Sequence, residues 1–143
     1  MQARLILTIG LPGSGKSHYA QMMADDSDRV VVIERDITRE HLTGSRRDFT
    51  REPEVTTANL FRAQDALRAG KIVIVSDTNL RPRYRREWAE LAASVGIEME
   101  TVSFLHVPIE VCAERDALRP DPVGLVAIEK MNQYLIASGQ VKS

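Results

Sequence analysis

The chain has 143 residues, of which 43% are hydrophobic and 27% are charged, so we expect a single domain with its own core over residues 1–143. A formal net charge of −1 excludes a protein that coats nucleic acid through a basic surface, so any such contact must come from local arginine clusters. No stretch approaches the ~20 apolar residues of a membrane span, and the lone Cys112, expected to be a buried apolar residue, cannot form an intramolecular disulfide. A soluble protein of the cytoplasm is therefore expected, with no membrane partner.

Short apolar runs alternate with amphipathic stretches along the chain. We expect strands over Leu5–Ile9, Val30–Ile33, Ile72–Val75 and Thr101–Leu105. Proline and glycine signals bound expected helices over Lys16–Ala24, Pro53–Arg68, Pro82–Ser94, Ile109–Ala117 and Val123–Ala137. A short helical run over Ile37–Leu42 and a mobile loop over Gly44–Asp48 complete the pattern. The alternation predicts an α/β fold with a parallel sheet, helices on both faces and a ligand site at the carboxyl ends of the strands.

The first expected strand runs directly into the segment Gly10–Ser17, which matches the GxxxxGK[ST] pattern of the P-loop. Glycines let successive backbone N–H groups converge on phosphates, and the following helix adds its positive N-terminal dipole. Lys16 is expected to bridge the β and γ phosphates of ATP, and Ser17 to ligate Mg²⁺. The predicted nucleotide-binding residues of this loop are Gly10, Pro12, Gly13, Ser14, Gly15, Lys16 and Ser17.

Two carboxylates follow the second and third expected strands, at the edge of the sheet where the P-loop lies. Asp36 is the candidate general base for an acceptor hydroxyl, with the alternative that it caps the helical run from Ile37. Asp77 occupies the place of a metal-binding Walker B acid, with the alternative that it is a turn residue before Pro82. The pattern therefore places a base and a metal ligand opposite the phosphates.

Arginines gather near the same edge. Arg39 shares a helical face with Asp36 and could hold an anionic acceptor. Arg115 and Arg119 flank a proline-bracketed break, as in the mobile lids that close over ATP in small P-loop kinases, and could bind the transferred phosphate; a solvated helix face is the alternative.

A denser basic cluster adjoins Asp77 and could contact the phosphates of a nucleic-acid strand, unless it is a simple surface patch. Its members are Arg81, Arg83, Arg85 and Arg86. Tyr84 could stack on a base, whereas Trp88 is expected in the core.

Distributed matches give the sequence a family resemblance. They comprise Leu7–Gly10 with Pro12–Ser17, Arg35-Asp36 with Arg39, Ser76–Leu80 with Pro82, Arg85 and Trp88, and Val107-Pro108 with Arg115 and Arg119. In these residues the chain resembles the kinase domain of the phage-type 5'-polynucleotide kinases. The resemblance spans most of the chain, and the Ser-Asp-Thr-Asn-Leu stretch at its distance from Arg35-Asp36 makes it specific.

The resemblance implies a P-loop NTPase-type fold with three layers, a four-stranded parallel sheet, a helical lid and a tunnel for a single-stranded end. It implies that Asp36 activates the 5'-hydroxyl of DNA or RNA, that Arg39 binds the phosphate 3' to the acceptor nucleoside, and that Lys16 and Arg119 stabilise the transition state. The acceptor site is predicted to comprise Asp36, Arg39, Asp77, Thr78, Asn79 and Arg85. Mg²⁺ is expected at Ser17 and Asp77.

The chain also departs from that family. Such kinases carry a C-terminal phosphatase domain, and nothing after Gly139 could supply its Asp-x-Asp-Gly-Thr motif, so no 3'-phosphatase is expected. The segment between Arg39 and Pro53 looks shorter, which leaves open the shape of the acceptor tunnel. A source in a phage or a bacterium is expected, and the oligomeric state is left open.

Rival functions remain open on the sequence. A P-loop kinase of a small molecule shares the P-loop and the lid, although Asp36, Arg39 and the Ser76–Leu80 stretch speak against it. A GTPase-type switch would need an Asn-Lys-x-Asp motif, which is absent. A toxin-like kinase of a cell-wall sugar nucleotide would need insertions for which 143 residues leave little room.

Overall fold

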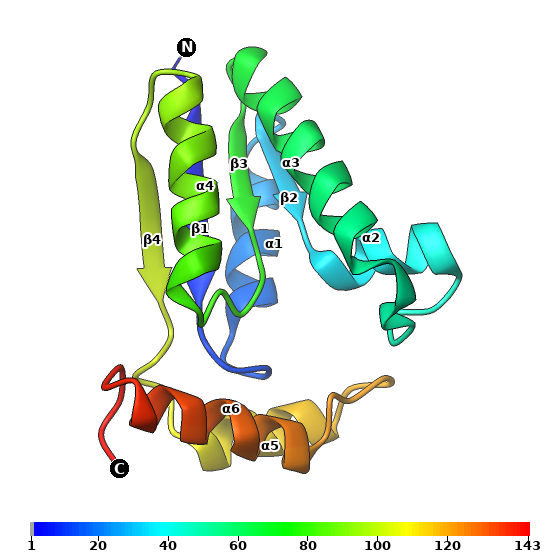
Figure 1. Cartoon of the computed structure of the whole chain (residues 1–143), viewed down its shortest axis with the longest axis vertical. Coiled ribbons are helices and arrows are strands. Elements are labelled where there is room, and N and C mark those ends of the chain that lie inside the picture. The colour runs from blue at the N-terminus through cyan, green and yellow to red at the C-terminus, as the bar shows by residue number, and fades with distance from the viewer. Residues whose placement is uncertain (1) are drawn as a thin grey trace.

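The computed structural model describes residues 2–143, whose strands form one parallel sheet in the order β2-β3-β1-β4 (Figure 1). The strands are β1 Arg4–Ile9, β2 Val30–Ile33, β3 Ile72–Val75 and β4 Met99–Ser103. All three pairings are parallel, with Leu5 opposite both Val73 and Met99. The expected α/β fold of the P-loop NTPase type with four parallel strands is confirmed.

Helices cover both faces of the sheet and its carboxyl edge. They are α1 Lys16–Asp26, α2 Arg35–Thr43, α3 Glu52–Arg68, α4 Pro82–Ser94, α5 Ile109–Ala117 and α6 Leu125–Ala137, with the 3-10 turn η1 Phe49–Arg51 before α3. Figure 1 shows α3 and α4 in front of the sheet, α1 behind it, and the α5–α6 pair across the carboxyl ends of the strands. None of the helices within residues 2–143 has the length and apolar character that a membrane crossing requires.

The alternation of side chains in β1 explains the layers. Leu5 and Leu7 are fully buried against the α3–α4 layer, in a cluster with Trp88. Ile6, which points to the opposite face, packs with Ala20 of α1. Trp88 is 6% exposed, so the expectation that it belongs to the core is confirmed.

A third cluster joins the P-loop to the α5–α6 pair. Leu11 packs there with Cys112 and Ile128, which fixes the helical pair beneath the phosphate loop. Cys112 is fully buried, as expected for a small apolar side chain.

The expected boundaries of the last strand were wrong by two residues. Thr101–Leu105 was expected, but β4 is Met99–Ser103, because an edge strand pairs only with β1 and tolerates polar side chains. Phe104 lies beyond the strand and packs edge-on against Tyr19 at 5.9 Å between ring centroids. The apolar character of Phe104 is explained by this packing and does not mark a strand residue.

Candidate active site

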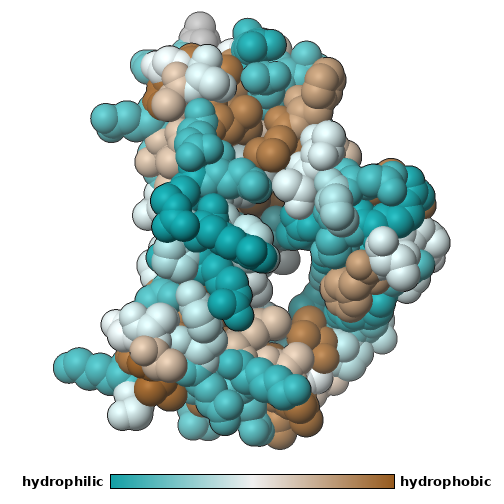
Figure 2. All heavy atoms as spheres, in the orientation of Figure 1, coloured by the Kyte–Doolittle hydropathy of each residue, from teal (hydrophilic) through white to brown (hydrophobic). Residues whose placement is uncertain are grey.

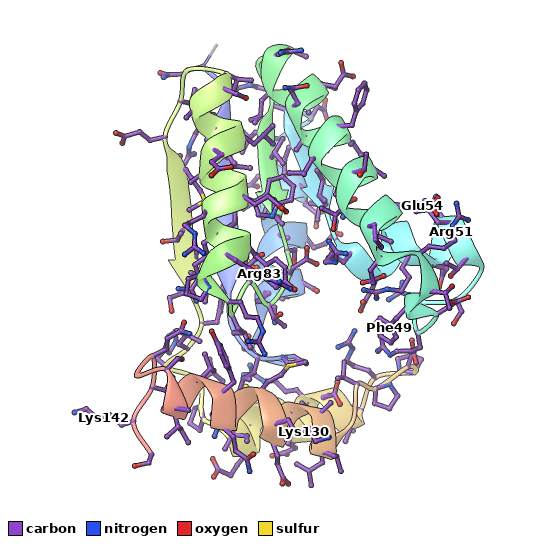
Figure 3. All side chains as sticks on the ribbon, in the orientation of Figure 1. Phe49, Arg51, Glu54, Arg83, Lys130 and Lys142 are labelled. Atoms are coloured by element: carbon purple, nitrogen blue, oxygen red, sulfur yellow. The ribbon has the colours of Figure 1, made fainter. Side chains whose placement is uncertain are left out.

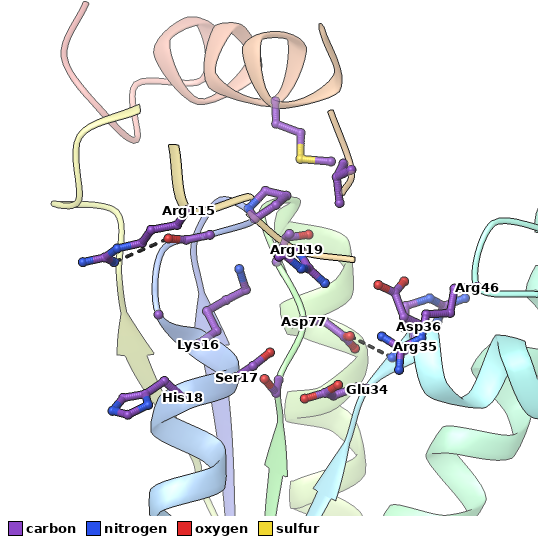
Figure 4. A pocket seen from close by; sticks show the side chains of 17 residues that line it. Lys16, Ser17, His18, Glu34, Arg35, Asp36, Arg46, Asp77, Arg115 and Arg119 are labelled. Carbon is purple, nitrogen blue, oxygen red and sulfur yellow. Dashed lines mark hydrogen bonds between the residues drawn. The ribbon is translucent and has the colours of Figure 1, made fainter. Parts of the chain in front are cut away.

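A cavity of about 590 Å³ opens at the carboxyl ends of the strands (Figure 4). Its walls are the P-loop, the residues that follow β2 and β3, and the end of α5, and we call it the main cavity. The predicted site residues that line it are Pro12, Gly13, Gly15, Lys16, Ser17, Asp36, Asp77, Thr78, Arg115 and Arg119. One space thus collects residues from four separate parts of the chain.

The P-loop is held tightly against α5. Gly13 has a φ of 80°, and a Cβ at this position would lie 2.2 Å from the carbonyl oxygen of Cys112, so a larger residue could not fit. Lys16 donates a hydrogen bond from Nζ to the carbonyl oxygen of Leu11 at 2.6 Å. Burial lowers the pKa of Lys16 to about 8. An incoming anionic phosphate would favour its charged form.

Asp77 connects β3 to the start of α2. Its Oδ1 accepts the backbone N–H of Arg35 at 2.8 Å, so one carboxylate oxygen supports the fold. Burial raises the pKa of Asp77 to about 6, and the Arg35 N–H partly offsets that effect. The other oxygen is the one available to a metal ion or its water.

Glu34 was not predicted as a site residue, yet it lines the main cavity beside Ser17 and Asp77 (Figure 4). Burial raises the pKa of Glu34 and the charge of Asp36 raises it further, while the positive charge of Arg46 acts in the opposite direction. Its position directly after β2 was the only sequence signal.

The oxygen atoms of this wall suit a hydrated Mg²⁺ ion. Ser76 Oγ, also in the lining, is buried and has no hydrogen-bond partner in the described chain. Mg²⁺ takes oxygen ligands and usually keeps several waters, held by one or two carboxylates and substrate phosphates. Ser17, Glu34 and Asp77 with the unpartnered Ser76 hydroxyl match that requirement, and within residues 2–143 no cluster of three His, Cys, Asp or Glu side chains offers an all-protein cage.

Asp36 is not a helix cap, and that alternative was wrong. The cap position of α2 is Glu34, and Asp36 lies inside the first turn of the helix. Its two carboxylate oxygens accept hydrogen bonds from Arg39 at 2.6 Å and from Arg47 at 3.3 Å. Asp36 is therefore held at the cavity wall by two guanidinium groups.

Arg39 is buried, with 4% of its surface exposed, and does not line the main cavity. It binds Glu52 through two hydrogen bonds of 2.8 and 2.6 Å, and its guanidinium lies 4.4 Å from the ring centroid of Phe49. Arg39 thus joins α2 to η1 and α3 while it orients Asp36. The sequence did not indicate Glu52 as its partner.

The two predicted lid arginines lie at the end of α5, Arg115 in its last turn and Arg119 two residues beyond it. Arg115 donates to the carbonyl oxygen of Gly13 at 3.5 Å, and Arg119 lies 3.5 Å from Asp116. Asp116 is 1% exposed and accepts the backbone N–H groups of Val123 at 3.0 Å and Gly124 at 2.9 Å. This buried carboxylate, which the sequence analysis missed, fixes the loop that follows Arg119.

Some predicted site residues lie outside the main cavity. Arg85 donates to the carbonyl oxygens of Asn79 and Leu80 and to Gln140 Oε1 at 2.5 Å, which joins α4 to the C-terminal segment. Asn79 has a φ of 46° and binds the carbonyl oxygen of Thr8, so it shapes the turn after β3. Gly10 and Ser14 pack within the P-loop, where a Cβ on Gly10 would meet Ser14 Oγ at 2.6 Å.

Comparison with known proteins gives a family match and several relatives. The model of the AAA domain family matches residues 5–136. A proposed bifunctional polynucleotide kinase/RNA ligase of Autographa californica nuclear polyhedrosis virus is 30% identical over 141 residues, which cover 92% of this chain and 20% of that protein. The chain therefore spans about one fifth of this relative.

Two solved structures show the same fold at lower identity. A chain in the structure of the Pnkp1/Rnl/Hen1 RNA repair complex superposes with a TM-score of 0.82 and 23% identity, over 97% of this chain and 46% of that one. A gluconokinase from Sinorhizobium meliloti 1021 superposes with a TM-score of 0.58 and 22% identity, over 91% of this chain and 73% of that one. The organisms named give no support for a phage source.

Proposed function

The chain belongs to the AAA domain family and is a P-loop kinase, and from this premise we propose that it transfers the γ-phosphate of ATP to the 5'-hydroxyl end of DNA or RNA. The observation that carries the proposal is the shared main cavity, in which Asp36 lies opposite Lys16 and Ser17. The 30% identity to a protein named as a polynucleotide kinase/RNA ligase supports the choice of acceptor.

On the donor side, the P-loop N–H groups and Lys16 would hold the β and γ phosphates. Arg119, at the lid end of the cavity, would balance the charge that spreads over the γ-phosphoryl oxygens during transfer. Mg²⁺, when bound, would neutralise charge on the same oxygens. Ser17 and Asp77 would hold that ion, with Glu34 and Ser76 binding its water.

On the acceptor side, Asp36 would accept the proton of the 5'-hydroxyl as that oxygen attacks the γ-phosphorus. A new O–P bond forms, the bond between the γ-phosphorus and the β–γ bridging oxygen breaks, and ADP leaves. Arg39 orients Asp36 from behind. Because Asp36 and Glu52 already occupy the guanidinium of Arg39, which does not line the main cavity, we assign the contact with the 3'-phosphate, predicted for Arg39, to Arg46, which does line it.

The relatives also suggest partners. One is named as a kinase joined to an RNA ligase, and another lies within an RNA repair complex with Rnl and Hen1. We therefore propose that this kinase prepares 5' ends for a ligase, as one domain with ATP and Mg²⁺ as cofactors. A kinase of a small hydroxyl compound is the second candidate, because the gluconokinase shares the fold.

The test is transfer of labelled γ-phosphate from ATP to a 5'-hydroxyl oligonucleotide, in parallel with gluconate, other sugars and nucleosides. We expect kcat/KM to be highest for the oligonucleotide and to rise when a nucleoside carries a 3'-phosphate. Faster transfer to a sugar than to any oligonucleotide would reject the polynucleotide assignment and leave the kinase assignment standing.

A further inference from the structure

A second cavity, of about 420 Å³, adjoins the main cavity on the side of α3 and α4. Arg35, Asp77 and Thr78 line both the main cavity and the second cavity, so the two cavities are adjacent. The rest of the wall of the second cavity comes from Asn79, the start of α3 and the first two turns of α4. A molecule whose reacting end lies at Asp36 could therefore extend into this second cavity.

The outer wall of the second cavity carries an aromatic platform. Tyr84 is 39% exposed. The guanidinium of Arg83 lies 4.8 Å from its ring centroid and donates to its hydroxyl at 2.9 Å. Arg83 projects from the start of α4 toward the open centre of the molecule (Figure 3). A ring that is already stacked with a cation offers a pre-ordered surface for a flat ligand.

The remaining wall offers polar partners for the edge of a planar ring. Glu87 and Thr78 line the second cavity, as does Glu52, whose carboxylate already accepts two hydrogen bonds from Arg39. Carboxylates accept hydrogen bonds from amino groups, which the edges of adenine, cytosine and guanine carry. An aromatic face next to carboxylate acceptors suits a nucleobase better than it suits a phosphate.

Figure 2 shows an opening between the lower end of α4, the α2–η1 side and the α5–α6 pair. Arg47 closes the far rim of this opening, because it bonds both Asp36 at 3.3 Å and the carbonyl oxygen of Asp121 at 3.0 Å. A strand that enters here would pass Arg83 and Tyr84 before its end reaches Asp36.

We propose that the second cavity binds the base of the second nucleotide of the acceptor strand, with Tyr84 as the stacking surface and Arg83 ordering that ring. This inference rests on the proposed function, because it specifies where the same acceptor lies. It assigns Tyr84 a role in binding extended acceptors and none in the chemical step.

The test compares a nucleoside 3'-monophosphate with 5'-hydroxyl dinucleotides and trinucleotides. Wild-type kcat/KM should rise from the mononucleotide to the dinucleotide, and Tyr84→Ala should remove that rise, roughly tenfold for one stacked base. The same variant should leave kcat/KM for the mononucleotide unchanged. Tyr84→Phe should retain the rise, because the ring remains.

Two controls isolate the stacking contact. Phe61→Ala removes an aromatic side chain that is 72% exposed on α3 and lies outside both cavities, and it should change no acceptor preference. A dinucleotide with an abasic second position should lose the rise in wild type and should be insensitive to Tyr84→Ala. In a direct binding measurement, 2-aminopurine at the second position should be quenched by wild type and not by Tyr84→Ala.

The outcomes separate the two levels of inference. If oligonucleotides are phosphorylated and Tyr84→Ala keeps the full rise with length, the second-base site is overturned while the proposed function stands. If wild type phosphorylates no oligonucleotide but does phosphorylate another hydroxyl acceptor, the proposed function itself fails.

Discussion

The phosphate side of the main cavity comes from one continuous segment, Gly10–Ser17, whereas the acceptor side is assembled from segments far apart in the chain. On the phosphate side, backbone N–H groups and two adjacent side chains carry the chemistry. On the acceptor side, Asp36 is positioned by Arg39, which is in turn held by Glu52. A local site can be identified from a motif, but a site held by ion pairs between helices depends on the whole fold.

The phosphate side should therefore show the largest effect on activity with the smallest effect on the fold. Lys16→Ala should lower phosphate transfer by ~10³-fold or more, because it removes the positive charge that the P-loop itself places at the β and γ phosphates. Steady-state transfer to an oligonucleotide measures the loss, and thermal unfolding checks the fold. Lys130→Ala, on the exposed face of α6, is the matched control and should be silent. Substantial transfer by the Lys16 variant would remove the P-loop from the mechanism.

The next largest effect is expected from substitution of Asp36, the candidate base on the acceptor side. Asp36→Asn keeps the shape and one hydrogen-bond acceptor for the arginines but removes the proton acceptor, so kcat should fall by ~10²-fold or more. Single-turnover transfer with bound acceptor isolates the chemical step, and acceptor affinity should stay near wild type. Asp65→Asn, on the exposed side of α3, should leave the rate unchanged. A rate near wild type for Asp36→Asn would show that another group takes the proton.

The ion pair between Arg39 and Glu52, which supports the acceptor side, should contribute to the stability of the fold. Glu52→Gln leaves the buried Arg39 with one charged partner fewer, so the free energy of unfolding should fall by about 2 kcal/mol, or roughly 30-fold in the folding constant. Urea unfolding at neutral pH measures the loss. Glu54→Gln, which breaks the exposed pair with Arg51, should cost less than about 1 kcal/mol.

The same pair predicts a pH dependence. The hydrogen bond from Arg39 holds the pKa of Glu52 below its ordinary value of 4.5. A carboxyl group with a lowered pKa stabilises the fold above its ordinary pKa, and this contribution is lost as the pH falls through the folded-state pKa. The difference in unfolding free energy between wild type and Glu52→Gln should therefore shrink as the pH falls below 4.5. If the two proteins differ in unfolding free energy by the same amount at neutral pH and well below pH 4.5, the charge of Glu52 is not the source of the difference.

The comparison also explains what the sequence could predict. The strands β2 and β3, the helices α4 and α5 and the P-loop follow from local patterns, and their expected bounds match the structure. Glu52 was missed because it lies 13 residues from Arg39 and meets it only through packing of α2 on α3. Asp116 was missed because a buried carboxylate on a helix face contradicts the usual pattern of burial. Arg85 was placed in the acceptor site by resemblance, whereas its bonds are to the fold itself.

The smallest expected effect concerns the lid, by which we mean the segment 118–124 between α5 and α6, where the two sides of the main cavity meet. Asp116 accepts two backbone N–H groups of the loop after Arg119, so Asp116→Ala should free that loop and lower kcat/KM by about tenfold, through a less well placed Arg119. Asp116→Asn keeps one acceptor oxygen and should retain most activity. Glu114→Ala, exposed on the same helix, controls for helix effects. Because Arg119 acts on the transferred phosphate and Arg47 bonds the lid at Asp121, the loss should appear with every acceptor, long or short. A loss confined to long acceptors would show instead that the lid acts on the acceptor. Arg119 would then belong to the acceptor side of the main cavity and not to its phosphate side.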